Sequence, residues 1–394
     1  MADNSTSIEM LELSGLRALV TGGAGFIGSH LVDACLAAGM TVRVLDCLME
    51  ASHGAGADWP EYLPESVEKM YGSVAVREDV FKALTNIDVV FHMSSIGGLV
   101  EGSVFMHENA TGMALMFDVI AQHKLPIKKI VVASSQGIYG EGRYASPDGT
   151  EFSLAGTGEV GMRKEADLDN GMWEVRCPKT GEPTTGACVP ECQTPMPASP
   201  YAISKMAVEQ LALVMGRAQG IPTVALRFGL TYGPRQSVKN AYSGIVSIFS
   251  TMILNGKNPI IYEDGLQTRD FTFVADNVAA QLLVMRDPRA NYQVFNVSTG
   301  VATTLNEVVE ILANEYGRPE LTGSRPGKYR LIDARHLVLD SSRLRALGWA
   351  PQYTAAMGLK AQATWIKTLG EVKDYFSDTM TKQEGASFVR GSKA

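Results

Sequence analysis

The sequence lacks the features of a membrane or secreted protein. Among its 394 residues, no apolar run reaches the ~18 residues that a membrane-spanning helix needs. Residues 1–12 are polar and acidic, without the basic start and apolar stretch of a secretory signal. The five cysteines are an odd number without paired spacing. We therefore expect a cytoplasmic protein with reduced thiols and no membrane partner.

The sequence also has no excess of positive charge. It contains 35 Lys and Arg against 42 Asp and Glu, for a net charge of −7. A protein that binds nucleic acid needs a basic surface to meet the phosphate backbone, so we expect no nucleic-acid partner. Cys177, Cys188 and Cys192 lack the paired C-x-x-C spacing of zinc sites. We therefore expect no metal.

What remains is the composition of an ordinary soluble enzyme, with 45% hydrophobic and 20% charged residues. At about 150 residues per domain, the length predicts two to three domains or lobes. The 39 glycines exceed the usual share of about 7%. They are either scattered through loops or placed where the backbone must approach a ligand.

Short apolar segments typical of buried strands alternate with segments of helical periodicity. The predicted strands are residues 16–21, 41–46, 87–92, 129–134 and 223–228. The predicted helices are residues 26–38, 109–123 and 201–217. This alternation predicts an α/β fold, a Rossmann-type doubly wound parallel sheet. Residues 141–198 interrupt it, since they are rich in Gly, Pro, Thr and Glu with few apolar runs, and we expect a surface insertion there.

A glycine loop joins the first predicted strand to the first predicted helix. Residues 21–28 read Thr-Gly-Gly-Ala-Gly-Phe-Ile-Gly, which contains G-x-G-x-x-G. Glycines permit a tight turn and leave room for a pyrophosphate at the helix N-terminus. Asp46 ends the second strand at about the spacing of an acid that binds the adenosine ribose, and its charge favours NAD over NADP. The alternative is a glycine-rich turn beside an incidental Asp.

Tyr201 and Lys205 lie four residues apart, on one face of a predicted helix. A nearby ammonium lowers the pKa of a phenol, so we expect Tyr201 to act as a base near neutral pH. Ser134 and Ser135 follow a predicted strand, at the sheet edge where ligands of open α/β folds bind. Their alternative role is to cap the turn. We expect His92, Asp270 and Asp276 to be structural.

Seven segments together resemble an extended short-chain dehydrogenase/reductase, in the NAD-dependent nucleotide-sugar epimerase/dehydratase branch. The resemblance covers residues 16–351. In detail, the chain is similar to bacterial nucleoside-diphosphate-sugar 4-epimerases of the dTDP-rhamnose, UDP-glucose and UDP-glucuronate type. The segments are Thr21–Gly28, Asp88–Ser95, Val132–Gly140, Pro200–Lys205, Leu226–Gln236, Asp264–Asp276 and Arg325–Pro351.

The resemblance implies a catalytic set of Tyr201, Lys205 and Ser135, the serine four residues before Tyr139. It places NAD on Gly22, Gly25, Phe26, Ile27, Gly28, Asp46, Ser73, Val74, Met93, Ser94, Ser95, Asn109, Ser134, Tyr201, Lys205 and Phe228. It places a nucleoside-diphosphate sugar on Ser135, Gln136, Gly137, Leu230, Arg235, Asn240, Arg269 and Arg325. Leu230 stands where the family often has Asn.

Arg269 and Arg325 are expected to clamp the diphosphate, because guanidinium groups match phosphate oxygens. The alternative for each is a surface ion pair. The resemblance also implies a homodimer that pairs helices near residues 109–123 and 201–217.

By the same resemblance, residues 13–200 form an NAD-binding Rossmann domain that includes the insertion. Residues 201–370 complete the Rossmann core and form a smaller C-terminal substrate-binding lobe, and residues 371–394 are a polar tail. Because the insertion lies between Ser135 and Tyr201 in the chain, we expect it to form a lid or wall near the sugar.

The implied activity is epimerisation, most simply at C4, by transient oxidation to a keto-sugar and return of hydride to the other face. Gln136 and Gly137 stand where family dehydratases carry an acid pair, which argues against dehydration. The alternatives are a nucleotide-sugar decarboxylase, an epimerase at another carbon, a dehydrogenase that releases NADH, and a catalytically idle NAD-binding protein.

Overall fold

The computed structural model describes residues 9–54, 56–98, 100–155, 162–239, 244–374, 376 and 389–392. Its centre is a sheet of seven parallel strands in the order β3-β2-β1-β4-β5-β9-β13. The strands are β1 (Arg17–Thr21), β2 (Thr41–Asp46), β3 (Glu68–Tyr71), β4 (Val89–His92), β5 (Lys129–Ser135), β9 (Thr223–Phe228) and β13 (Val294–Val297). The order reverses between β1 and β4, as in a doubly wound sheet, so the predicted α/β Rossmann-type fold is confirmed.

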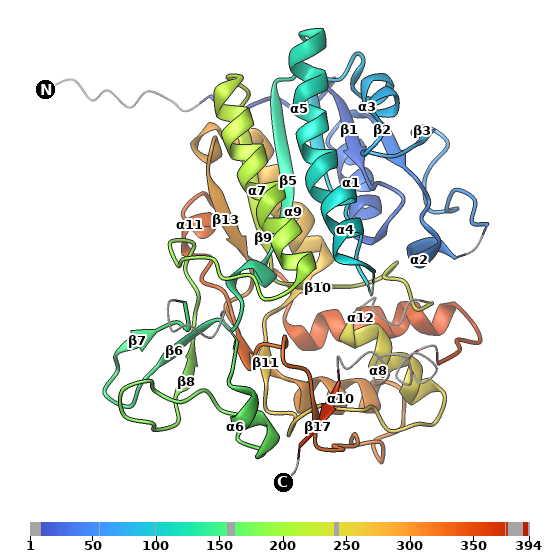
Figure 1. The fold of residues 1–394 in the computed structure, drawn as a ribbon. Helices are drawn as coiled ribbons and strands as arrows, with labels where there is room; N and C mark the ends of the chain where they lie inside the picture. Colours follow the sequence, from blue (N-terminus) through green and yellow to red (C-terminus); the bar gives the residue numbers. More distant parts are fainter. Residues whose placement is uncertain are drawn as a thin grey trace, which may run out of the picture.

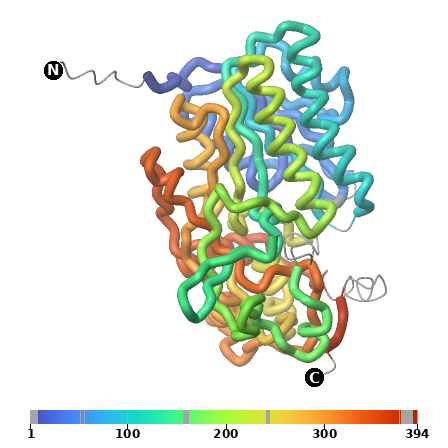
Figure 2. Tube along the Cα trace, turned by 60° about the vertical axis from the view of Figure 1, so that its left-hand side comes forward, coloured from blue at the N-terminus to red at the C-terminus, as the bar shows by residue number. Residues whose placement is uncertain are grey.

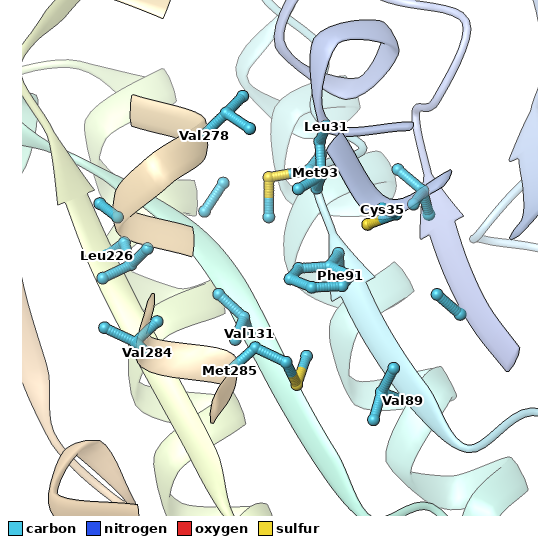
Figure 3. Packing of buried hydrophobic residues seen from close by; sticks show 14 of the residues in the cluster. Leu31, Cys35, Val89, Phe91, Met93, Val131, Leu226, Val278, Val284 and Met285 are labelled. Atoms are coloured by element: carbon cyan, nitrogen blue, oxygen red, sulfur yellow. The ribbon is translucent and has the colours of Figure 1, made fainter. Parts of the chain in front are cut away.

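Helices cover both faces of this sheet (Figure 1). On one face pack α3 (Arg77–Leu84), α5 (Gly112–His123) and α7 (Pro200–Ala218), and on the other α1 (Phe26–Ala37) and α9 (Val274–Arg286). Figure 3 shows Phe91, Val131 and Leu226 of the sheet beside Val284 and Met285 of α9. Burying each such side chain stabilises the fold by about 1.5–3 kcal/mol relative to exposure.

The predicted elements match closely in this lobe, with one difference. The helix predicted at residues 109–123 begins earlier, as the π-helix η1 (Met106–Thr111), which continues into α5. Helix α7 begins where Ser199 accepts a hydrogen bond from the backbone N–H of Ala202 and Pro200 occupies its first turn. Both features favour a helix start at this point.

A smaller lobe lies beyond the carboxyl ends of the central strands (Figures 1 and 2). Its helices are α8 (Ile245–Leu254), α10 (Leu305–Glu315) and α12 (Ala355–Thr368). They pack around buried Phe249, Phe271 and Leu312. Its strands form the pair β10 (Leu230–Tyr232) and β12 (Phe271–Phe273) and the set β14 (Thr303–Thr304), β11 (Thr268–Arg269) and β16 (His336–Leu337).

The insertion has more regular structure than its composition predicts. It contains a three-stranded sheet of β6 (Arg143–Ala145), β7 (Glu151–Phe152) and β8 (Thr185–Ala187), and the helix α6 (Glu165–Asp169). It lies against the smaller lobe (Figures 1 and 2), and Val189 bridges Leu339. Apolar periodicity does not reveal these strands, because several of the buried side chains of the insertion are polar or charged.

The other elements are short. They are α2 (Glu50–His53), α4 (Gly102–Phe105), η2 (Gln136–Tyr139), η3 (Pro288–Ala290), α11 (Ser342–Arg345), β15 (Lys328–Tyr329) and β17 (Arg390–Gly391). Part of the polar tail is ordered, because β17 pairs with β15, whereas residues 377–388 lie outside the described ranges. Within the described ranges, no helix is both long enough and apolar enough to cross a bilayer.

Candidate active site

The glycine loop lies between β1 and the start of α1 and has a backbone geometry that excludes side chains. A Cβ atom at Gly28 would lie 2.1 Å from the carbonyl oxygen of Gly22, and one at Gly22 would lie 2.8 Å from the Cα of Ser94. Gly25 is the N-cap of α1, and no side chain caps the helix. The first N–H groups of α1 are therefore available to a phosphate.

Asp46 closes one side of this loop from the end of β2. One carboxylate oxygen accepts a hydrogen bond from the backbone N–H of Ala24 at 3.0 Å, and the other accepts from Leu48 at 2.9 Å. The side chain is thus fixed by the glycine loop, at the sheet edge where an adenosine ribose is bound in dinucleotide-binding folds.

The loop and Asp46 line a cavity of about 600 Å³ at the carboxyl edge of the sheet. Most residues that the sequence assigns to NAD lie on its wall, namely Gly22, Gly25, Phe26, Ile27, Gly28, Asp46, Ser73, Val74, Met93, Ser94, Ser95 and Asn109. Ser134, Tyr201, Lys205 and Phe228 are assigned to NAD by sequence but are absent from this lining.

The smaller lobe supplies part of the same wall, which the sequence does not predict. Arg235, Gln236, Ser237, Val238, Lys239, Trp365 and Leu369 line the cavity together with the glycine loop. Arg235 and Gln236 end a segment that carries the resemblance, which assigns Arg235 to the sugar, and no motif marks the other five, because only the packing of the two lobes brings them to the cofactor side.

Arg235 shows this packing most clearly. Sequence resemblance assigns it to the sugar, but its guanidinium pairs with Asp33 of α1 at 2.8 Å and lies 4.7 Å from the centre of the Tyr62 ring. The Tyr62 hydroxyl donates to the carbonyl oxygen of Ala24 at 2.7 Å. Arg235 therefore joins the smaller lobe to the glycine loop.

Asn109 reaches the cavity from the π-helix η1. Its side-chain oxygen accepts from the backbone N–H of Ile96 at 2.9 Å, and its amide nitrogen donates to Ser204 of α7 at 2.9 Å. Single-turn π-helices occur frequently at functional sites because they re-aim one side chain within a helix. Here η1 fixes the loop after β4 against α7.

Tyr201, Ser135 and Lys205 come together beside this cavity. The Tyr201 hydroxyl lies close enough to the Ser135 and Ser95 side chains for both to favour its ionised form, and the Tyr201 ring meets Phe105 edge to face at 5.9 Å. The Ser135 hydroxyl also accepts from the backbone N–H of Gly137 at 3.1 Å. Lys205, one turn along α7, is 2% exposed.

The pKa of Tyr201 shifts in the direction opposite to the one that the sequence predicts. Burial raises the pKa of Tyr201, although its hydrogen bonds with Ser135 and Ser95 oppose the increase. Burial also lowers the pKa of Lys205 to about 8. The expected lowering of the Tyr201 pKa by Lys205 is therefore not observed, because removing the phenolate from water costs more than the surrounding groups return.

His92 is a packed residue, as expected. It ends β4, its Nδ1 lies 3.0 Å from the Thr21 hydroxyl, and burial together with the charge of Lys205 lowers its pKa to about 3. The imidazole is therefore neutral at physiological pH.

Ser134 faces the interior, on the opposite side of β5 from Ser135. Its hydroxyl donates to Glu209 of α7 at 2.7 Å, and Arg227 pairs with the same carboxylate at 2.6 Å. Because Glu209 and Lys205 lie on one face of α7, the buried ion pair holds the catalytic helix against β9, and the Ser134 hydrogen bond holds it against β5, which carries Ser135. Removing one partner of such a pair typically costs about 3–5 kcal/mol.

A second cavity of about 260 Å³ lies in the smaller lobe. Leu230 and Arg269, both assigned to the substrate by sequence, are on its wall. The remaining lining residues are Gly244, Ile245, Ile248, Ile260, Tyr262, Glu263, Gln267, Leu305, Arg330, Asp333, Ala334 and Phe376. The cavity thus combines an apolar wall with charged groups, as a nucleotide requires.

Arg269 presents a guanidinium that has no acidic partner within the described part of the chain. It donates to the carbonyl oxygens of Thr268 at 2.8 Å and Arg335 at 3.3 Å. Among the described residues, no carboxylate forms an ion pair with it, whereas Arg330 on the same wall pairs with Asp333 at 2.8 Å. Burial lowers the Arg269 pKa, and an anion would relieve that unfavourable environment.

The other predicted substrate residues have different positions. Arg325 is exposed and donates to Asn306 at 2.6 Å and to the carbonyl oxygen of Asp264 at 3.2 Å, and it is absent from the lining of this cavity. Asn240 lies outside the described residues. Gln136 and Gly137 lie in η2, next to Ser135, and the buried Oε1 of Gln136 has no hydrogen-bond partner among the described residues.

Asp270 and Asp276 are structural, as expected. Asp270 is buried and accepts hydrogen bonds from the backbone N–H groups of Thr299 and Gly300, at 2.8 and 2.7 Å. Asp276 accepts from the backbone of Gln352 at 2.8 Å. All five cysteines are free thiols, and within the described part of the chain no cluster of His, Cys, Asp and Glu could hold a metal ion.

Known proteins share sequence features with this chain. The sequence profile of the NAD dependent epimerase/dehydratase family matches residues 18–159 and 180–298. The chain is 32% identical to dTDP-L-rhamnose 4-epimerase of Burkholderia thailandensis over 93% of this chain and 98% of that protein.

Two solved structures resemble the fold. The UDP-glucose 4-epimerase of Thermotoga maritima with UDP-glucose has a TM-score of 0.72 and 28% identity, covering 90% of this chain and all (100%) of that one. The UDP-glucose 4-epimerase of Thermus thermophilus in complex with NAD has a TM-score of 0.67 and 29% identity, covering 89% of this chain and 99% of that one.

Proposed function

The chain belongs to the NAD-dependent epimerase/dehydratase family, and we propose that it inverts C4 of a nucleoside-diphosphate sugar. The observation that carries this proposal is the approach of the Tyr201 and Ser135 hydroxyls beside the glycine-loop cavity, with buried Lys205 one turn along the same helix. With NAD bound, a site that holds these groups can remove hydride from a secondary alcohol and then return it.

In this mechanism, Tyr201 Oη accepts the proton of the C4 hydroxyl and later returns it. Ser135 Oγ hydrogen-bonds the sugar oxygen and passes the proton to Tyr201 as the keto-sugar forms. In this mechanism the Lys205 ammonium, one turn along α7, favours the negative charge that develops on Tyr201 during proton transfer.

The residues present fit NAD. The glycine loop, which has no room for side chains, and the uncapped start of α1 match a pyrophosphate. The Asp46 carboxylate matches a ribose diol. When bound, NAD supplies the hydride acceptor and donor, and its positive nicotinamide ring favours the phenolate form of Tyr201. Enclosure by both lobes, including Arg235 and Trp365, suits a dinucleotide retained between turnovers.

For the substrate, we propose that Arg269 binds the diphosphate and that the apolar wall around Leu230, Ile245 and Ile248 holds the rest of the nucleotide. Gln136, which follows Ser135 in η2, stays a predicted substrate ligand, and within the described residues its buried Oε1 has no hydrogen-bond partner. Arg325 and Asn240 remain predicted substrate ligands.

Decarboxylation and epimerisation at another carbon use the same oxidation step, so the geometry of Tyr201 and Ser135 does not separate them from C4 inversion. Dehydration is disfavoured, because Gln136 and Gly137 provide neither the acid nor the base for loss of water. A catalytically idle NAD-binding protein would not need Tyr201, Ser135 and Lys205 together.

The test is to incubate the purified enzyme with a panel of UDP- and dTDP-sugars and to identify products by NMR. We expect interconversion of one C4 epimer pair without net formation of NADH. Loss of CO₂ from a uronic acid, inversion at another carbon, or no conversion of any sugar would contradict the proposal.

We also propose that the protein is a cytoplasmic homodimer. Ile203 and Val214 on α7 are apolar and are 47% and 63% exposed, which supports a dimer face on this helix. The free thiols support a reducing compartment. Light scattering should give twice the chain mass, and Val214→Glu should shift it towards the monomer. A monomeric wild type would contradict the dimer.

A further inference from the structure

Arg163, from the insertion, is buried next to the substrate cavity. Its guanidinium pairs with Glu263 at 2.6 Å and with Glu141 at 3.3 Å. It also donates to the carbonyl oxygens of Trp173 and Asp333, at 3.0 and 2.7 Å. One insertion side chain is thus tied to both the insertion and the smaller lobe.

Glu263 is the important partner because it shares the substrate cavity with Arg269. It is 4% exposed, and its φ of 56° places a non-glycine residue in the left-handed region. Backbone strain of this kind persists only where surrounding contacts hold it. Its two carboxylate oxygens are held separately, one by Arg163 at 2.6 Å and the other by Arg335 at 3.1 Å.

Among the described residues, the acidic side chains near Arg269 pair with other arginines and not with Arg269. Arg335 also holds Asp264 at 2.7 Å, and Arg330 holds Asp333. Glu141, Glu263 and Asp333 are close enough to act electrostatically on Arg269, yet within the described ranges none is its ion-pair partner. Each acidic group near Arg269 is occupied by another arginine.

We propose that Arg163 is a positioning residue for substrate binding: by holding the Glu263 carboxylate, it keeps that carboxylate from pairing with Arg269 and leaves Arg269 for the diphosphate. The inference rests on the proposed function, because it needs an anionic substrate in the smaller lobe. It assigns the insertion a specific role, which is to control the charge of the substrate cavity.

Loss of Arg163 should therefore weaken binding of the anion and leave the rest of the site unchanged. Without Arg163, one oxygen of Glu263 loses its partner and is free to compete with the diphosphate for Arg269. Recognition of the base and ribose, which depends on the apolar wall, should be unchanged. A purely structural role of Arg163 would weaken both.

The experiment measures binding of UDP, dTDP, uridine and thymidine to the NAD-loaded enzyme by calorimetry, for four proteins. They are the wild type, Arg163→Met, Arg163→Met with Glu263→Gln, and the control Arg176→Met. Arg176 is also in the insertion but donates to Gly181 at an exposed position.

We expect Arg163→Met to weaken binding of the preferred diphosphate about tenfold while the matching nucleoside changes less than about twofold. The double variant should recover to within about threefold of wild type, because glutamine carries no charge to compete. KM for the sugar nucleotide should follow the diphosphate, with kcat unchanged. The control should match wild type.

Equal weakening of diphosphate and nucleoside, no recovery in the double variant, or no change in Arg163→Met would overturn the inference. If Arg163→Met does not fold, Glu263→Gln alone decides. It should bind the diphosphate as tightly as wild type or more tightly, and a tenfold loss would overturn the inference. A wild type that binds neither diphosphate would instead contradict the proposed function, and the inference with it.

Discussion

The cofactor cavity and the substrate cavity are built by different means. The cofactor side is centred on one continuous stretch, made of a strand, a glycine loop, a helix start and the acid at the end of the next strand, with further wall from the smaller lobe. The substrate side is made of side chains from segments far apart in the chain, whose charges are balanced by arginines of the insertion and the smaller lobe. The centre of the first depends on the backbone conformation of the glycine loop, whereas the second depends on which charged side chains pair with each other.

The largest expected effect comes from the hydroxyl proposed to carry the proton. Tyr201→Phe removes this hydroxyl, which lies near Ser135, and we expect kcat to fall by roughly 10²–10⁴-fold. KM and bound NAD should be unchanged, as measured by steady-state kinetics and by the cofactor content of the purified protein. The exposed Tyr71→Phe is the control, and substantial activity in Tyr201→Phe would remove Tyr201 from the mechanism.

A backbone change should damage the cofactor side alone. Gly28→Ala would place a Cβ atom 2.1 Å from the Gly22 carbonyl oxygen. The loop must then shift, at a cost of about 1–3 kcal/mol in stability. We expect loss of bound NAD and a lower Tm, measured by cofactor content and calorimetry. Gly391→Ala, with no atom within 4 Å of the added Cβ, is the matched control. Normal NAD content in Gly28→Ala would contradict a tightly fitted loop.

A side-chain change should damage the substrate side alone. Arg269→Gln removes the guanidinium that has no acidic partner in the described chain, and we expect the nucleoside diphosphate to bind about 10- to 100-fold more weakly. NAD content should stay the same, since Arg269 is absent from the cofactor wall. Calorimetry measures the first quantity and absorbance the second. Unchanged diphosphate binding would move the substrate anion to another site.

The smallest expected effect is on the pH dependence of stability. Burial lowers the Lys205 pKa from 10.5 to about 8. The unfolded chain therefore holds more protons than the folded one between these values. Below pH 8, burial of the charged amine lowers the free energy of unfolding by its full amount. As pH rises from 8 towards 10.5 this penalty decreases, so the free energy of unfolding increases by at most about 1.4 kcal/mol per pH unit. Denaturant unfolding of wild type and Lys205→Met should show this difference in slope, and parallel curves would contradict a buried, charged Lys205 below pH 8.

The comparison also explains how much the sequence could predict. The strands at residues 17–21, 41–46 and 129–135 and the helix α7 are close to their predicted bounds, because each has a local pattern of apolar residues or a capping signal. Gly28 and Asp46 could be assigned for the same reason, since a short motif fixes their relative positions.

What could not be predicted depends on long-range packing. Sequence resemblance assigns Arg235 to the sugar, but the approach of the two lobes places it against Tyr62 and Asp33 on the cofactor side. The insertion has few apolar residues to reveal its strands, and the pairing of Arg163 with Glu263 joins positions 100 residues apart. No spacing in the sequence records such a pair.

The most direct test of the central claim follows the C4 hydrogen through the reaction. The enzyme is incubated with its preferred nucleotide sugar carrying deuterium at C4, in ordinary water, and the products are examined by NMR and mass spectrometry. Transient oxidation with retained cofactor predicts inverted product that keeps its deuterium, with no accumulation of free NADH. Loss of deuterium to water, or one NADH released per sugar converted, would contradict the account.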